Sequence, residues 1–221
     1  MEDRPKRMQR LLISLIALLT PVAALAQPPA PQTVHVRGTI VSTSPGSILV
    51  NEGSLQETIT FGREMHLIGV VNSSLDKVVP GAFIGTTVAP QADGSLKALE
   101  VHIFPAALKG TGEGYRPWEK QHKRMMANAT VQSVDRPQNM MANATIRRVD
   151  SGTTGRTVLL VYKGGTKSVV IAPNVPVVAL QPGTKSLLTI GAHVFVIATR
   201  ASNGLVARAI NVGEDGVVPP M

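Results

Sequence analysis

The chain contains no cysteine among its 221 residues, and aromatic residues make up only 3% of it. The first absence excludes disulfides, a thiolate nucleophile and the acylated cysteine of a lipoprotein. The second predicts a core built from Val, Ile, Leu and Ala. Scarce aromatics also argue against a nucleic-acid partner, because single strands are bound by stacking bases on exposed aromatic side chains.

Long apolar runs are missing as well, apart from one short run at 11–19. Four basic residues precede it, and Pro21 and the small-x-small sequence at 24–26 follow it. This order is typical of a secretory signal peptide over 1–26. The alternative is a membrane anchor, but 11–26 offers only 16 residues with a proline inside, against about 20 for a spanning helix. We therefore expect a periplasmic or secreted protein that does not span the membrane after cleavage.

Motifs of catalysis are absent too. The sequence has no GxSxG, no HExxH and no glycine-rich phosphate loop. Glu113, in the stretch GTGEGYRPW, is the one carboxylate in a glycine-rich setting. A lone carboxylate does not provide an acid–base pair. We predict that the protein is not an enzyme and that Trp118, in the same stretch, packs its segment onto a barrel.

What the sequence does have is many short β-branched stretches bounded by Gly, Pro, Asn and Asp, such as SILV at 47–50 and HVFVIATR at 193–200. This spacing predicts an all-β fold of small barrels. The two halves also match at an offset of 106 to 111 residues, and each has a hairpin dipeptide, at 93–94 and 203–204. We predict two tandem OB-like β-barrels after the signal peptide, at 27–104 and 140–221, joined by a basic connector at 105–139.

A hexapeptide, MMANAT, occurs twice near the end of the connector, and the two copies run over 125–135 and 140–150. Aligning the halves assigns the second copy as the first strand of the second barrel. The first copy is then a local duplication of 15 residues. We expect that it can be deleted without loss of the fold.

Positive charge gathers in the middle of the chain, where 105–149 holds eight basic and three acidic residues of a chain with net charge +8. Such a segment is either a solvated connector or a surface for anionic lipid headgroups, lipopolysaccharide or another polyanion. The candidate polyanion-binding residues are Lys109, Arg116, Lys120, Lys123 and Arg124.

A metal site is the alternative. Two residues apart on a predicted strand, Glu100 and His102 share a face and would supply two of the four ligands that zinc or copper needs. Methionines near His122 suggest Cu(I) instead. The alternative without a metal is that Glu100 and His102 form a solvated pair on an edge strand and that the methionines are gap-filling apolar side chains. The candidate ligands are Glu100, His102, His122, Met125, Met126, Met140 and Met141; no other cofactor is predicted.

Three stretches, DGSLKALEVHIFPAALKGTGEGYRPWE, MANAT and VGEDGVVPPM, resemble a family of exported alphaproteobacterial proteins. The resemblance covers most of 80–221 and implies a domain of unknown function with an OB-like barrel. Such proteins are often labelled metal ABC transporter permeases, but a permease needs several spanning helices. The family usually has His where Tyr115 stands, and a single strand start of the TNAT kind. We expect a binding or scaffolding module of the cell envelope, or alternatively a periplasmic accessory protein that binds copper or zinc.

Overall fold

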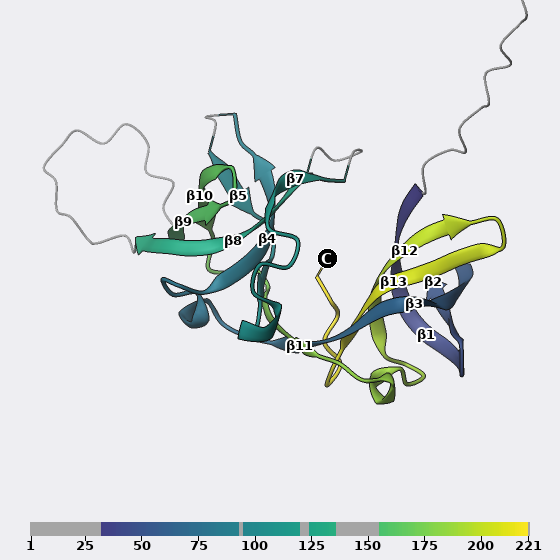
Figure 1. Cartoon of the computed structure of the whole chain (residues 1–221). Helices are drawn as coiled ribbons and strands as arrows, with labels where there is room; N and C mark the ends of the chain where they lie inside the picture. The colour runs from purple at the N-terminus through teal and green to yellow at the C-terminus, as the bar shows by residue number, and fades with distance from the viewer. Residues whose placement is uncertain (1–31, 93–94, 120–123, 136–154, 221) are drawn as a thin grey trace, which may run out of the picture. The chain divides into compact units, whose positions relative to one another are not determined.

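The computed structural model of the chain describes residues 32–92, 95–119, 124–135 and 155–220 (Figure 1). The predicted signal peptide and the second MMANAT copy lie outside these residues. Also outside them are five of the candidate site residues, namely Lys120, His122, Lys123, Met140 and Met141. No helix in the described ranges is long and apolar enough to cross a membrane.

The fold is all-β, as predicted. The described residues form thirteen strands, which are β1 (Gln32–Ser44), β2 (Ser47–Glu52), β3 (Leu55–Asn72), β4 (Phe83–Pro90), β5 (Leu96–Ala98), β6 (Val101–Ile103), β7 (Gly114–Glu119), β8 (Arg124–Asp135), β9 (Arg156–Tyr162), β10 (Gly165–Ile171), β11 (Val177–Pro182), β12 (His193–Ala201) and β13 (Gly204–Gly213). Three 3₁₀ turns connect them, namely η1 (Leu75–Lys77), η2 (Ala106–Leu108) and η3 (Lys185–Leu187). The strands form one continuous sheet that closes on itself twice.

The first closed set of strands, called ring A here, contains β1, β2, β3, β13 and β12 in that order of pairing. All its pairings are antiparallel except that of β3 with β13. Alternate residues point into it, as period-two strands require. Its core is entirely aliphatic and includes Val36, Ile40, Ile48, Val50, Ile59, Val194, Val196, Leu205, Ile210 and Val212.

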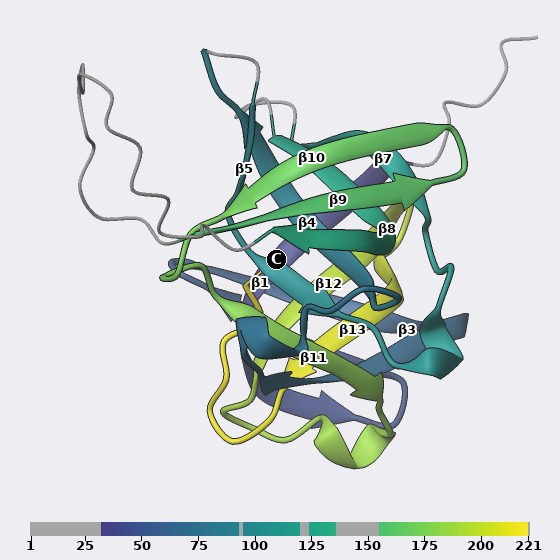
Figure 2. The ribbon, with the colours of Figure 1, turned by 90° about the vertical axis from the view of Figure 1, so that its left-hand side faces the viewer.

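The second closed set, ring B, contains β8, β9, β10, β5 and β4, and again one pairing is parallel, that of β10 with β5. Figure 2 shows β8, β9 and β10 beside one another. On the other side of β8, β7 adds an antiparallel strand, and β6 continues the line of β5 to pair with β4 and β11. Its core is also aliphatic and includes Ile84, Val101, Val131, Leu160 and Val169.

Neither ring is made by one continuous half of the chain, which the predicted units 27–104 and 140–221 would require. Ring A combines β1–β3 with β12 and β13, and ring B combines β8–β10 with β4 and β5. The chain passes between the rings where the end of β3 pairs antiparallel with β11, from Ile68 opposite Pro182 to Asn72 opposite Val178. The first half therefore gives β4 and β5 to ring B, and the second half gives β12 and β13 to ring A.

The predicted repeat is visible in the registers of the parallel pairs. Leu205 lies opposite Ile59 in ring A, and Leu96 lies opposite Val169 in ring B. Leu205 follows Leu96 by 109 residues, and Val169 follows Ile59 by 110. The same pairing is thus made twice, each time between a strand of one half and a strand of the other.

The first MMANAT copy, predicted as a local duplication in the connector, forms a strand, which the sequence had left open. It forms β8, where Ala129 lies opposite Ile84, just as Gly38 of β1 lies opposite Val194 in ring A. The first copy therefore occupies the first-strand position of ring B that was predicted for the second copy. The predicted connector 105–139 contains β7 and β8 as well as loop.

Candidate functional site

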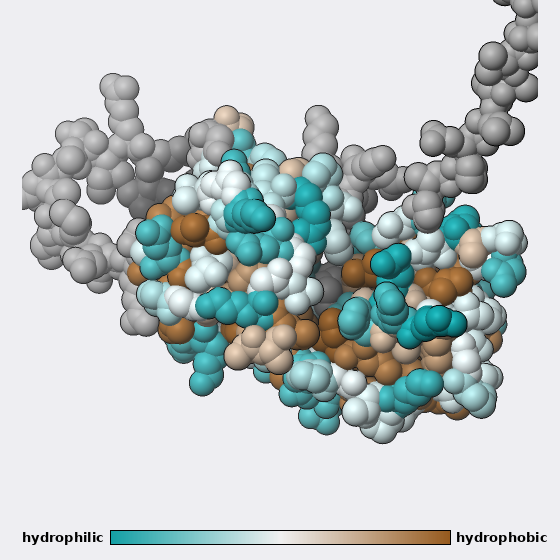
Figure 3. Space-filling view, in the orientation of Figure 1, coloured by the Kyte–Doolittle hydropathy of each residue, from teal (hydrophilic) through white to brown (hydrophobic). Residues whose placement is uncertain are grey.

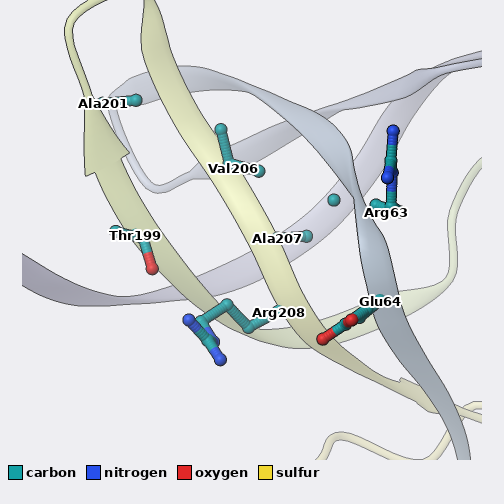
Figure 4. A pocket seen from close by; sticks show the side chains of 8 residues that line it. Arg63, Glu64, Thr199, Ala201, Val206, Ala207 and Arg208 are labelled. Carbon is teal, nitrogen blue, oxygen red and sulfur yellow. The ribbon is translucent and has the colours of Figure 1, made fainter. Parts of the chain in front are cut away.

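Two large hollows open among the described residues, and the first is a groove of about 410 Å³ on ring A. It is lined by Gly62, Arg63, Glu64, Thr199, Ala201, Val206, Ala207 and Arg208 (Figure 4). Its charged side chains, Arg63, Glu64 and Arg208, are exposed and extend from the strands in different directions. Because water already solvates these charged groups, none of them needs a ligand to offset a cost of burial.

The second hollow, called the His102 cavity here, has a volume of about 440 Å³. Most of its wall is apolar and includes Leu67, Ile68, Phe104, Leu108, Met126, Leu180 and Ile197. Figure 3 shows hydrophobic residues gathered over β3 and β13, two of the strands that contribute to this wall. A few polar side chains interrupt the wall, namely His66, His102, Thr111, Arg116, Trp118, Asn128 and Asn211. An apolar wall with a few polar groups is typical of small-molecule sites.

His102 stands on β6 with only 2% of its surface exposed. Burial lowers the pKa of its imidazole to about 4, so the side chain is neutral at pH 7. Its Nε2 lies 3.6 Å from Oε1 of Glu100, too far for a hydrogen bond. No other described residue offers this atom a partner. His102 therefore presents a buried polar atom that is free to bind.

Glu100 is also buried, with 6% exposed, so the predicted solvated edge pair is wrong. The hydroxyl of Thr87 donates to Glu100 Oε1 at 2.6 Å, and that of Thr86 donates to the Glu100 carbonyl at 2.6 Å. The carboxylate also borders a pocket of about 80 Å³ that Trp118 and Arg124 help to line. Residues of β7 and β8 thus surround what looked like an outer strand face.

Trp118 and Asn128 contribute two further buried polar atoms. The indole of Trp118 packs 4.5 Å from the imidazole of His35 and 6.1 Å from the ring of Phe195, measured between centroids, which confirms the predicted packing. Its Nε1 finds no hydrogen-bond partner in the described residues. Asn128, 7% exposed, donates from Nδ2 to the Thr111 carbonyl at 3.2 Å, but its Oδ1 has no partner among them either.

Arg116 brings a positive charge to the cavity. Its Nη1 donates to the Gly112 carbonyl at 2.6 Å. Burial lowers the pKa of its guanidinium from the usual value, but an arginine in a protein stays protonated. A partly desolvated cation of this kind favours an anionic partner.

The structure groups the candidate site residues differently from the sequence prediction. Arg116, His102 and Met126 line one cavity, although the sequence placed the first in a polyanion surface and the others in a metal site. Lys109 is exposed on the loop after η2, and Arg124 and Glu100 border the smaller pocket. Met125 is half-buried beside the core of ring B. Among the described residues no three His, Asp or Glu side chains gather as metal ligands, so the metal site stays a prediction.

Sequence reasoning missed Trp118 and Asn128 as cavity-lining residues. A signal for Asn128 was present in the motif MMANAT. On a strand, Ala127 and Ala129 face the core of ring B, so Met126 and Asn128 face the opposite way. All four are buried, which means that both faces of β8 are covered. Compared with protein-family models, curated proteins and solved structures, the chain matches none.

Proposed function

We propose that this protein is an exported, non-catalytic binding protein of the bacterial cell envelope that holds a small ligand in the His102 cavity. One observation carries the proposal. Three buried polar atoms without partners, His102 Nε2, Trp118 Nε1 and Asn128 Oδ1, belong to residues that line this cavity. Each unpartnered buried group costs about 1–3 kcal/mol, and a bound ligand would recover part of that cost.

The size and the scaffold support the same proposal. A volume of about 440 Å³ lies within the range of roughly 300–1,000 Å³ that small-molecule sites occupy. Two closed five-stranded rings are consistent with OB-like barrels, a scaffold that binds many kinds of ligand. Export rests on the signal-peptide pattern of residues 1–26, and the absence of catalysis rests on the missing motifs.

The chain provides its own reporter for a binding test, because Trp118 is its single tryptophan and lines the cavity. The probe is 8-anilinonaphthalene-1-sulfonate, titrated into the exported protein while the emission of Trp118 is recorded. We expect saturable quenching of Trp118 with energy transfer to the probe at one site per chain.

A matched pair of variants locates that site. Ala209→Phe places a bulky side chain on the wall of the His102 cavity and should abolish the quenching. Ala201→Phe makes the same change in the exposed groove of ring A and should leave it intact. Quenching that survives Ala209→Phe, or that never occurs, would exclude the cavity as the ligand site.

A further inference from the structure

The charge distribution in the His102 cavity points to the class of ligand that would bind there. This inference rests on the proposed binding site. Arg116 is the one residue with a permanent charge among the described lining residues, and no carboxylate is found in that lining. No described Asp or Glu forms an ion pair with Arg116. The cavity therefore has a positive charge that the described part of the protein does not neutralise.

The donors of Arg116 suit a carboxylate. A guanidinium has five N–H donors in a planar fork that matches two carboxylate oxygens, and the Gly112 carbonyl accepts from Nη1. Trp118, two residues along β7, lines the same cavity and adds the unpartnered indole N–H. Two donors on one strand thus border the space where an anionic group would sit.

The rest of the cavity wall requires an apolar part in the ligand. Phe104, Leu108, Met126, Leu180 and Ile197 surround the space with hydrocarbon. A compact polyanion such as phosphate would leave this wall without contacts, and a neutral hydrocarbon would leave Arg116 without an anion. A molecule with an apolar body and one carboxylate satisfies both.

We propose that the ligand of the His102 cavity is an amphipathic monocarboxylate, with its carboxylate against Arg116 and its hydrocarbon body along the apolar wall. The neutral His102 adds no second cation, which favours one negative charge over several. Its free Nε2 and the Oδ1 of Asn128 are left for polar substituents on the body or for water.

Three probes with the same ten-carbon chain test the charge: decanoate, decanol and decylamine. Each is titrated into the exported protein at pH 7.5, with Trp118 emission as the readout. We expect decanoate to bind at least tenfold more tightly than decanol, because a hydrogen-bonded charge pair is worth more than a neutral contact. Decylamine should bind more weakly than both, because its cation meets Arg116.

Variants then assign the preference to one residue. Arg116→Gln should lower the affinity for decanoate at least tenfold and bring it to that of decanol, while Arg116→Lys should retain part of the preference. Lys109→Gln, on the exposed loop, is the matched control and should change nothing. Equal binding of decanoate and decanol by the native protein overturns the inference, even if the variant fails to fold, yet leaves the proposed binding site standing. If neither these probes nor 8-anilinonaphthalene-1-sulfonate affect Trp118, the binding site itself is disproved.

Discussion

Rings A and B share one scheme of strand pairing but differ in the polarity of several buried side chains. Ile84 in ring B and Val194 in ring A occupy equivalent places, because each lies opposite the matching residue of its first strand. Counting from these two, Thr86 and Thr87 of ring B correspond to Val196 and Ile197 of ring A. The pairing of β5 and β13 likewise makes Glu100 correspond to Ala209, and His102 to Asn211.

Buried polar side chains are therefore concentrated on one ring. The strands of ring B and its continuation β6 contain or flank Thr86, Thr87, Glu100, His102 and Asn128, whereas Asn211 is the one buried polar residue described on ring A. Ring A makes the same fold with Val, Ile and Ala at three of these places, so the fold does not require polar groups there. Because buried polar groups are costly, their presence in ring B and β6 supports the proposed binding role.

The largest expected difference between the rings concerns their cores. Ile40 in ring A is fully buried, and Ile40→Ala should cost about 2–5 kcal/mol in the free energy of unfolding. Val131 is its counterpart in ring B, and Val131→Ala should cost less. The side chain is smaller, and we expect the second MMANAT copy, which has Ile146 at the same place, to substitute for β8. Urea denaturation measures both; an equal or larger loss for Val131→Ala would contradict this view of the second copy.

Strand patterns predicted the fold class well but not the exchange between halves. Alternation of β-branched residues is local, so it identified the strands and the repeat. Equivalent positions of the two halves hold the same residue type, Leu96 and Leu205, and their partners Val169 and Ile59 are both β-branched. Local sequence therefore allows either half to pair with itself or with the other. The long strand β3 continues past ring A to pair with β11, so it carries the chain from one ring towards the other.

The site shows the same division between local and distant information. The sequence placed Glu100 and His102 on one strand face, but it did not reveal that residues of β7 and β8 surround that face. Arg116 stands in a basic stretch typical of solvent-exposed connectors, yet it lines a cavity. Burial of these residues depends on strands paired through the fold, which no local pattern encodes.

Acidification should weaken the protein through His102. The pKa of this buried imidazole is about 4 in the folded state and 6.5 when exposed, so the unfolded chain binds the extra proton first as the pH falls. Stability is then lost between pH 6.5 and 4, by up to about 3 kcal/mol. His102→Asn, which installs the residue of ring A, should remove that part of the pH dependence.

Denaturation curves at pH 7, 5.5 and 4.5 measure the effect. His66 also lines the cavity but is exposed, so His66→Asn is the control and should retain the native slope. A His102→Asn protein that loses stability over this range as steeply as the native protein would show that His102 does not stay neutral in the fold.

A smaller effect on stability should follow from removing the hydrogen bond between Thr87 and Glu100, which the corresponding Ile197 and Ala209 of ring A cannot make. Thr87→Val keeps the shape of the side chain but removes the donor to Glu100 Oε1, which should cost about 1–3 kcal/mol. Thr87→Ser keeps the hydroxyl and should cost less. In ring A, Ile197→Val removes a carbon from a half-buried side chain and should cost less than Thr87→Val. If thermal unfolding instead shows Thr87→Val to be harmless, the polar groups of ring B are not held as described.

The smallest effect is expected from two deletions of equal length. Deleting 125–139 leaves only the second MMANAT copy, and deleting 136–150 leaves only the first. Either change shortens the connection from the first strand of ring B to Arg156 from 20 residues to five. Loop closure then favours the folded state by about 1 kcal/mol.

The second copy repeats Met126, Ala127, Asn128 and Ala129 without change, so both the core and the His102 cavity keep their residues. At Val131 it has Ile146, and this added methylene in a packed core offsets some of the gain. Both proteins should therefore unfold within about 1 kcal/mol of each other and quench equally with 8-anilinonaphthalene-1-sulfonate. A deletion of 125–139 that alone unfolds or stops binding would mean that the two copies are not interchangeable. The difference between the rings would then extend to their first strands, since only ring B would depend on one particular copy of a duplicated sequence.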